Sequence, residues 1–478
     1  PSIALVDISI TVPALGDQED ERYLGIMRAG SQFIGAGQVF ENPNDIDFTS
    51  QYNSEGFPNR TKIPNFDSNN RLINYTMTKR EVVVNGLTKT FKKVINNNDV
   101  KPFFEFFLPE KNVISITSLI QKDGVNYQSP PTYDEFISSP DKWYEVDALA
   151  ESKIFIEDPT RPADKPGLKV GKYIETENRF VSEYTPEGYC KVNFGGGTTT
   201  PEEQLQEFTR TGIPLRIQDY QNNIGLGLTV KANTTLFVQY RVGGGSNTNL
   251  GSNTITTTNL VNMFVNGPID ATNISVRQSL TVNNPIPALG GRDEPTVDEI
   301  RNLVRYNFAS QNRAVTIKDY QARVSLMPGE FGVPFRSGVF EEQNKILVYI
   351  LGLDNAGKLT NTSTSTLKQN ISDYLADYRM LNDYVVIGDG QIVNIGFEFD
   401  LMIEKEYPKS QIISNVITVV TEFMDIHKHH MGENIYLGQL IENVNNVAGV
   451  INVVDIRLFN KVGNNKYSMN EIEQPYLV

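Results

Sequence analysis

The chain has 478 residues, of which 39% are hydrophobic and 21% are charged, as in a globular protein of about three domains at ~150 residues each. Its formal net charge of −14 disfavours nonspecific binding to nucleic acid or to anionic membranes. No run of about 18 apolar residues is present, which excludes a membrane-spanning helix. Cys190 is the single cysteine. An internal disulfide is therefore excluded, a reducing cytoplasm suits the chain, and we expect Cys190 to be a small buried hydrophobe.

Residues 1–130 carry the signals of a β-rich domain with long loops. Two strand signals, at 81–84 and 114–120, are each followed by a dipeptide that favours positive φ, Asn85-Gly86 and Asp123-Gly124. Such dipeptides are typical of tight hairpin turns, so we expect a hairpin at each position.

Three stretches in this first domain allow a more specific interpretation. Residues 42–74 are rich in Asn, Asp, Ser and Pro, and we expect a long irregular loop of the kind that is usually functional or interfacial. Residues 19–22, Glu-Asp-Glu-Arg, are expected to form a solvated charged face. Four phenylalanines around Glu105 are expected to lie in the core: Phe103, Phe104, Phe106 and Phe107.

Residues 131–260 are expected to form a second β-rich domain, similar to a barrel or a sandwich. Short β-branched or aromatic stretches separated by glycine, proline and charge predict its strands, at 143–146, 153–156, 180–184 and 235–240. The Gly/Ser/Asn/Thr-rich residues 243–259 predict a connection toward the helices that follow.

Residues 261–340 contain a central pair of capped helices. Thr296 and Glu299 have the spacing of a capping box, and Thr316 with Asp319 is a shorter version of it. Each cap is followed by an apolar stripe at helical spacing, so each helix is expected to lie on a packing partner. The stripes consist of Val297, Ile300, Val304 and Phe308, and of Ile317, Tyr320, Val324 and Met327.

Residues 341–478 predict an α+β C-terminal domain. Apolar alternation and helical periodicity predict strands at 345–351, 393–403 and 450–459 and helices at 367–378, 409–424 and 436–447. We expect helices packed on one face of an antiparallel sheet. The fold class expected for the whole chain is therefore multidomain α+β, with a β-rich N-terminal half, a central helical pair and an α+β C-terminal domain.

The central stretch resembles the core of the baseplate J-like family of contractile phage tails. The likeness consists of Gly290-Gly291-Arg292-Asp293-Glu294, a helix, and then an Arg-Ala-Val-Thr-x-x-Asp-Tyr sequence at 313–320. Glycine-containing strand segments at 192–197 and 238–247, and Gly-Val before a strand at 448–453, resemble further parts of the family. The residues singled out for a structural role are Gly290, Gly291, Asp293, Thr296, Glu299, Thr316, Asp319 and Tyr320.

The resemblance implies a structural subunit of a tail baseplate in the virion, assembled in the host cytoplasm. It implies self-association into a ring, contacts with other wedge proteins, and indirect links to hub and sheath-initiating proteins, without nucleic acid or membrane as a partner. It also implies further sequence ahead of Pro1, and since the chain starts without methionine we expect a fragment or a processed product. Where the family often has Gly-Asp, this chain has Gly195-Gly196-Gly197, so no role of that aspartate is carried over.

The residues that could carry chemistry favour a protein that is not an enzyme. The glycine clusters lack the Gly-Lys-Ser/Thr ending of a phosphate loop. The three histidines, His427, His429 and His430, lie in one run, which leaves little room for a catalytic triad. They lack a fourth ligand at fixed spacing for a metal, so neither a metal nor another cofactor is expected.

The alternative is a carbohydrate-binding or carbohydrate-cleaving virion adhesin, which would need two carboxylates meeting across a cleft. In the favoured interpretation, the contact surfaces are expected at residues 42–98 and in the apolar C-terminal tail, 461–478.

Overall fold

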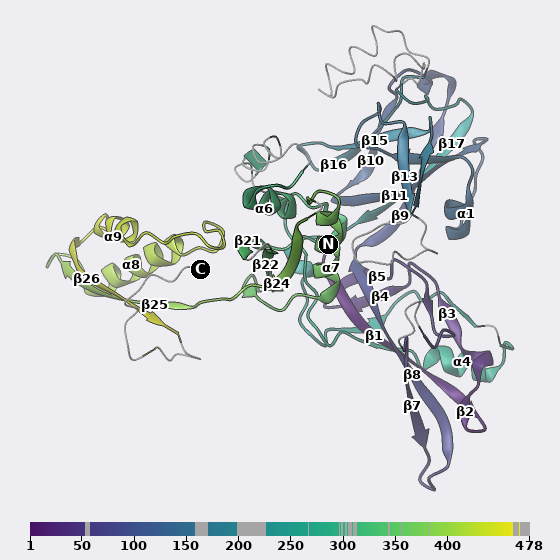
Figure 1. Cartoon of the computed structure of the whole chain (residues 1–478), viewed down its shortest axis with the longest axis horizontal. Helices are drawn as coiled ribbons and strands as arrows, with labels where there is room; N and C mark the ends of the chain where they lie inside the picture. Colours follow the sequence, from purple (N-terminus) through teal and green to yellow (C-terminus); the bar gives the residue numbers. More distant parts are fainter. Residues whose placement is uncertain are drawn as a thin grey trace.

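The computed structural model confirms a strand-rich, multidomain α+β fold (Figure 1). It describes residues 1–52, 58–157, 171–197, 226–265, 267–295, 313–342, 345–354, 356–380, 382–461 and 468, together with Val297, Ile300, Arg301, Val304 and Phe308. The C-terminal tail expected to form a contact surface therefore lies almost wholly outside the described residues, as do Thr296 and Glu299.

An eight-stranded sheet forms the N-terminal part of the structure. Its order is β18-β4-β5-β8-β1-β2, with β20 on β1 and β7 on β8. The long strands β1 and β8 run antiparallel, with Ile3 opposite Val84 and Pro13 opposite Asn74. Alternate residues of β1 are buried, as expected for a sheet with one dry face. The strands are β1 (Ile3–Leu15), β2 (Gln18–Glu19), β4 (Gln32–Gly35), β5 (Gln38–Glu41), β7 (Thr61–Phe66), β8 (Leu72–Asn85), β18 (Ile255–Thr258) and β20 (Thr281–Asn283).

A smaller sheet and a helix cover the buried face of this first sheet. The sheet has the order β19-β3-β6, and its residues share one hydrophobic core with those of β1, β5 and β8. The elements are β3 (Gly25–Met27), β6 (Ile46–Asp47), β19 (Met263–Val265) and helix α4 (Ala271–Gln278).

The prediction of an irregular loop at 42–74 is wrong for the second half of that stretch. Residues 61–66 form β7, which pairs antiparallel with β8 from Thr61 opposite Thr78 onward. The resulting β7–β8 hairpin projects from the first sheet at the bottom of Figure 1. Residues 53–57 lie outside the described part. The polar composition of this stretch belongs to an exposed edge strand and its turn.

The expected solvated face at 19–22 is confirmed for Glu21 and Arg22, which are exposed, and wrong for the first two residues. Glu19 and Asp20 are buried. Glu19 pairs with Arg60 at 2.6 Å and with Lys62, while Asp20 caps a short 3-10 helix and pairs with Arg22. The cations that neutralise Glu19 lie on and beside β7, far along the chain, so the run itself gives no indication of its burial.

A seven-stranded sheet forms the second strand-rich unit, with the order β10-β16-β15-β12-β11-β17-β9. Helix α1 (Tyr133–Ser138) and a two-stranded ribbon of β13 (Lys153–Glu157) and β14 (Gly171–Glu175) accompany it. Its strands are β9 (Leu87–Ile95), β10 (Glu105–Lys111), β11 (Val113–Asp123), β12 (Lys142–Glu145), β15 (Arg179–Tyr184), β16 (Tyr189–Phe194) and β17 (Thr234–Val242).

Only part of the expected phenylalanine core is found in this unit. Phe104 and Phe106 are buried, with ring centroids 6.1 and 6.0 Å from that of Phe194. Phe107 is exposed, and Phe103 lies outside the core cluster with φ +56°. Alternation along β10 turns Phe106 inward and Phe107 outward, so a run of four phenylalanines could not all be buried.

Neither expected tight hairpin is present. Gly86 has φ +126°, but the chain leaves the first sheet there: β8 pairs with β1, whereas β9 pairs with β17 of the second sheet. Gly124 has φ +99°, and α1 follows it before the antiparallel partner β12. The dipeptides correctly indicated positive φ, but the pairing partners of the strands are set by distant residues.

Residues 243–259 do not lead directly to the central helices. They contain β18, which pairs with β4, and β20 then pairs with β1, so residues 255–283 complete the first sheet. The division of the chain into segments 1–130, 131–260, 261–340 and 341–478 stays a prediction.

A third core lies between helices α6 and α7 and a sheet of the order β21-β22-β23, in which β24 pairs parallel with β22. The strands and helices expected from 345 to 378 are present. The elements are α6 (Ile317–Ser325), the 3-10 helix η4 (Gly329–Phe331), β21 (Arg336–Glu342), β22 (Lys345–Leu353), β23 (Leu359–Thr360), α7 (Ser365–Ala376) and β24 (Tyr384–Asp389).

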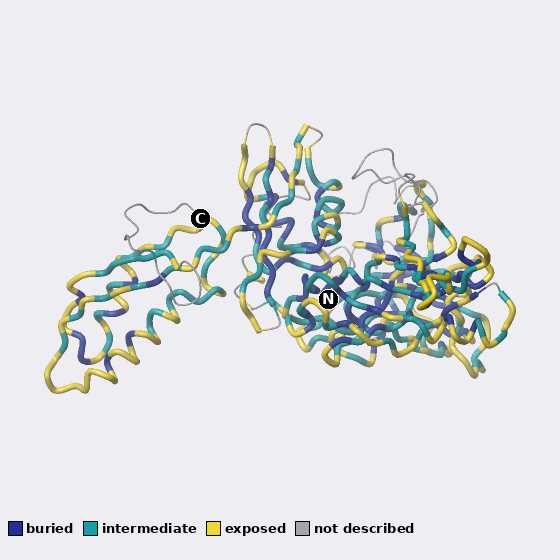
Figure 2. Tube along the Cα trace, turned by 90° about the horizontal axis from the view of Figure 1, so that it is seen from below, coloured by how far each residue is buried: buried dark blue, intermediate teal, exposed yellow. Residues whose placement is uncertain are grey.

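Residues 395–460, here called the arm, have a fourth core of their own. A two-stranded antiparallel sheet packs against two helices, at the positions that the sequence predicts. Figures 1 and 2 show the arm projecting away from the strand-rich units. Its elements are β25 (Ile395–Ile403), α8 (Lys409–Phe423), α9 (Leu437–Asn445) and β26 (Val450–Asn460).

Candidate functional site

The two central glycines meet different requirements. Gly290 has φ +99°, a conformation that favours glycine. Gly291 does not have positive φ, but a Cβ on it would lie 2.5 Å from the carbonyl oxygen of Gly245. The side chain of Asn249 also accepts from the Gly291 amide and donates to the Gly291 carbonyl, each at 2.8 Å. Gly291 is therefore required for close backbone approach.

Asp293 connects this turn by hydrogen bonds to the segment that follows the glycines at 243–245. Its carboxylate accepts from the Ser246 amide at 2.8 Å and from the Ser246 hydroxyl at 2.5 Å. These bonds, with a smaller contribution from His427, hold the pKa of Asp293 below its usual value. Gly243, Gly244 and Gly245 all have positive φ, as expected for a turn at a strand end. The partners Asn249 and Ser246 were not predicted, because no local pattern links them to Gly291 and Asp293.

The second half of the motif is anchored in the third core. Thr316 and Asp319 form a capping box, in which the Thr316 hydroxyl accepts from the Asp319 amide at 3.2 Å and Asp319 accepts from the Thr316 amide at 2.8 Å. Tyr320 is fully buried, and its hydroxyl donates to Asp383 at 2.6 Å. Burial and the neighbouring Asp383 carboxylate raise the pKa of Tyr320.

The described residues of the apolar stripe on the first central helix are exposed. These residues have helical backbone. Their exposed fractions range from 44% for Ile300 to 86% for Phe308. In the single chain this stripe presents apolar side chains to solvent, so the expectation of a packing partner stays a prediction.

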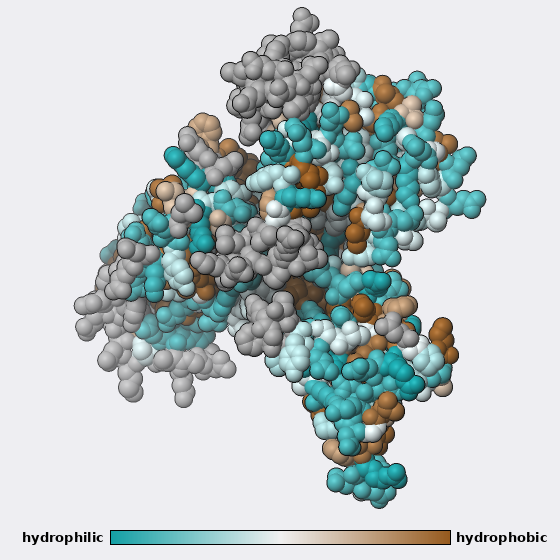
Figure 3. Space-filling model, turned by 45° about the vertical axis from the view of Figure 1, so that its right-hand side comes forward, coloured by the Kyte–Doolittle hydropathy of each residue, from teal (hydrophilic) through white to brown (hydrophobic). Residues whose placement is uncertain are grey.

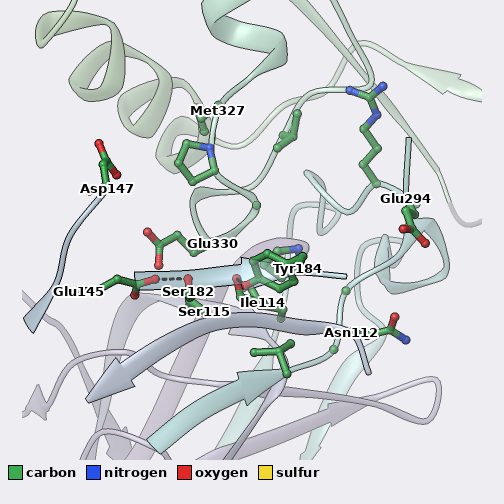
Figure 4. Close-up of a pocket in the computed structure, with 18 of the residues that line it drawn as sticks. Asn112, Ile114, Ser115, Glu145, Asp147, Ser182, Tyr184, Glu294, Met327 and Glu330 are labelled. Atoms are coloured by element: carbon green, nitrogen blue, oxygen red, sulfur yellow. Dashed lines mark hydrogen bonds between the residues drawn. The ribbon is translucent and has the colours of Figure 1, made fainter. Parts of the chain in front are cut away.

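A cavity of about 1380 Å³ lies where the motif, η4 and the seven-stranded sheet meet. Figure 4 shows Glu145 and Glu330 directed into it from different elements, and Ser182 donates to Glu145. Burial raises the pKa of both carboxyl groups. The hydrogen bond from Ser182 opposes the rise at Glu145, whereas the negative charge of Glu330 adds to it. At Glu330, a hydrogen bond from Ser115 opposes the rise. The sequence could not show this pair, because only the fold brings β12 and η4 together.

Two of the histidines contact phenylalanine residues or their backbone, and the cysteine is buried. The His427 ring stands edge-on to Phe335, and Nε2 of His429 lies 2.7 Å from the Phe423 carbonyl oxygen. Among the described residues, no group of three or more His, Cys, Asp or Glu is arranged to hold a metal ion. Cys190 is buried as expected, and burial raises the pKa of its thiol to about 12.

Within the part of the chain that the structure describes, none of the helices has the length and apolar character needed to cross a membrane.

The comparisons with known proteins leave the family of the chain open. No protein-family model matches the sequence, and no curated protein matches it. A chain in the cryo-EM structure of the anti-feeding prophage baseplate, six-fold symmetrised, is similar with a TM-score of 0.25 and 10% sequence identity. That match covers 98% of this chain and 75% of the other.

Proposed function

We propose that the chain is a structural, non-enzymatic subunit of a contractile phage tail baseplate, of the wedge or inner-ring type found in T-even phages. The observation that carries the proposal is the position of the motif that resembles the baseplate J-like family. Gly291 and Asp293 fasten the segment after β17, and Tyr320 enters the third core. The motif thus connects the segment after β17 with the third core. A subunit that passes a conformational change from one of its parts to another needs such a connection.

Two exposed apolar surfaces support an assembly role. One is the stripe on the first central helix. The other is the β7–β8 hairpin, on which Ile63, Phe66 and Ile73 are about half exposed. Figure 3 shows hydrophobic side chains behind a hydrophilic tip on this projection. Because the chain carries a net charge of −14, contact between copies must come from apolar and backbone complementarity, while charge helps to select a more basic partner.

The proposed partners are further copies of the chain, other wedge proteins, and hub and sheath-initiating proteins through them. The subunit would assemble in the host cytoplasm, reside in the virion baseplate and couple it to sheath contraction. Contacts that close by rotation generate a ring.

We expect this chain to self-associate in a concentration-dependent manner in sedimentation velocity, and to form a complex with purified wedge proteins. The double substitution Ile63→Asp with Phe66→Asp should weaken association, because it places charge on the apolar part of the hairpin. Ser68→Asp with Asn69→Asp adds the same charge at the exposed tip and is the matched control. A chain that stays monomeric at high micromolar concentration and does not shift with wedge proteins would contradict the proposal.

The adhesin alternative is favoured by one observation, the two carboxyl groups with raised pKa in the cavity. Glycoside cleavage uses such a pair when both flank the scissile bond. We expect no release of reducing sugar from cell-wall or surface polysaccharide by the wild-type chain. Activity that disappears in Glu330→Gln but persists in the control Glu341→Gln, whose carboxyl lies outside the cavity, would favour the alternative.

A further inference from the structure

Among the described residues, the arm meets the rest of the chain at two places. Residues 390–394 join β24 to β25 covalently. The second place is the turn between α8 and α9, residues 425–433, here called the histidine loop, which reaches back to the sheet of β21 and β22. The arm's own core consists of residues from β25, α8, α9 and β26. Its orientation therefore depends on a short connection and one loop.

A methionine forms the apolar centre of the loop contact. A Cβ on Gly338 of β21 would lie 2.7 Å from Sδ of Met431, and a Cβ on Gly390 would lie 2.8 Å from its Cε. Met431 thus occupies a socket that exists because both positions are glycine. Methionine is unbranched and flexible, so it can enter and leave such a gap without rearranging the backbone.

Polar and charged side chains surround the Met431 contact, and one of their buried hydrogen-bond donors has no partner among the described residues. His427 stands edge-on to Phe335, with ring centroids 5.3 Å apart. Beside Phe335, Nη2 of Arg336 is buried, and none of the described residues provides a hydrogen-bond partner for it. Burial lowers the pKa of Arg336 despite the opposing charges of Glu433 and Asp425 in the loop. A buried unsatisfied donor costs free energy that exposure to water recovers, so opening of the contact is partly compensated.

We propose that the histidine loop is a releasable latch, in which Met431 in the Gly338–Gly390 socket holds the arm in one orientation and its withdrawal frees the arm to turn about residues 390–394. A contact made by a single loop between two parts of a chain permits relative motion of those parts. A few residues at the ends of elements can act as the hinge. The inference concerns the isolated chain and does not depend on the proposed function.

The test uses two substitutions that disrupt the Met431 contact, one in the histidine loop and one in the socket on β21. Met431→Asp places a charge in it, and Gly338→Val occupies it without changing the arm. Met402→Asp, on the exposed face of β25, is the matched control. Spin labels on Thr362→Cys in the body and Ser414→Cys on α8 report the distance between the two parts by double electron–electron resonance. The buried Cys190 stays in place.

We expect one narrow distance distribution for the wild type and for Met402→Asp, and loss of that narrow distribution in both socket variants. Hydrogen exchange of α8 and α9 should be unchanged in all of them, because the arm's own core is not altered. A narrow distribution in both socket variants would overturn the latch, as would a broad one in the wild type. Loss of α8 and α9 protection in Met431→Asp would instead assign Met431 to the arm's own fold and also overturn it.

Discussion

Replacing Gly291 by alanine should lower the free energy of unfolding by roughly 3–5 kcal/mol. The new Cβ would lie 2.5 Å from the Gly245 carbonyl oxygen and 2.5 Å from the Thr248 hydroxyl. Backbone must move to remove these clashes, and that movement breaks the paired bonds between Gly291 and the Asn249 side chain, which are buried. The cost therefore combines overpacking with unsatisfied buried polar groups.

Gly438→Ala is the matched control. Gly438 lies in the first turn of α9, where an added Cβ meets no atom within 4 Å, and alanine there should stabilise by at most about 0.5 kcal/mol. Urea unfolding followed by circular dichroism measures both variants. Equal midpoints for Gly291→Ala and the wild type would mean that the turn is not a joint between cores.

Elements with a local signal could be predicted from the sequence. The alternation of apolar and polar residues predicted β25, and apolar residues at helical spacing predicted α7, which begins after a cap in which Thr364 accepts from the Leu367 amide. Both signals come from residues within a few positions of one another. They do not depend on what the element packs against.

Strand pairing and burial could not be predicted in the same way. β18 and β20 are short, and they join strands formed more than two hundred residues earlier in the chain, with Ile255 opposite Gly35 and Val282 opposite Ile8. A short strand has too few residues to identify such a partner by its pattern. The same limit explains why Asn85-Gly86 indicated a hairpin but forms a passage between two sheets.

The hydrogen-bond partners of the candidate site residues were predicted only where they are close in sequence. Thr316 and Asp319 are three residues apart, and their reciprocal bonds follow from that spacing. The bonds of Gly291 with Asn249 and of Asp293 with Ser246 span more than forty residues, so only the fold brings these partners together.

The second large loss of stability is expected when the buried ion pair between Glu19 and Arg60 is broken. The two side chains are each 4% exposed, and they form an ion pair at 2.6 Å that Lys62 extends. The Arg60 guanidinium also donates to the Phe48 carbonyl. Arg60→Ala removes the more buried of the two cations that neutralise Glu19 and leaves its carboxylate with Lys62 alone, so the substitution should cost about 2–3 kcal/mol. Arg28→Ala, which removes an exposed pair with Asp45, should cost only about 0–1 kcal/mol.

The contribution of Glu19 should also depend on pH in a defined direction. Burial alone would raise the pKa of Glu19, but hydrogen bonds from Lys62 and its own backbone, with the charges of Lys62 and Arg60, lower it below the unfolded value of 4.5. The unfolded state therefore binds a proton first as pH falls. The stabilisation is fully present above pH 4.5 and is lost as pH falls through the folded pKa.

Urea unfolding of the wild type and of Glu19→Gln from about pH 7 to about pH 3 measures this contribution as the difference between the two curves. Glutamine mimics the protonated carboxyl group, so the difference should be constant near neutrality and shrink at acidic pH. Other carboxylates change the stability of both proteins equally and cancel in the difference. A difference that does not vary with pH would show that Glu19 acts through packing and not through its charge.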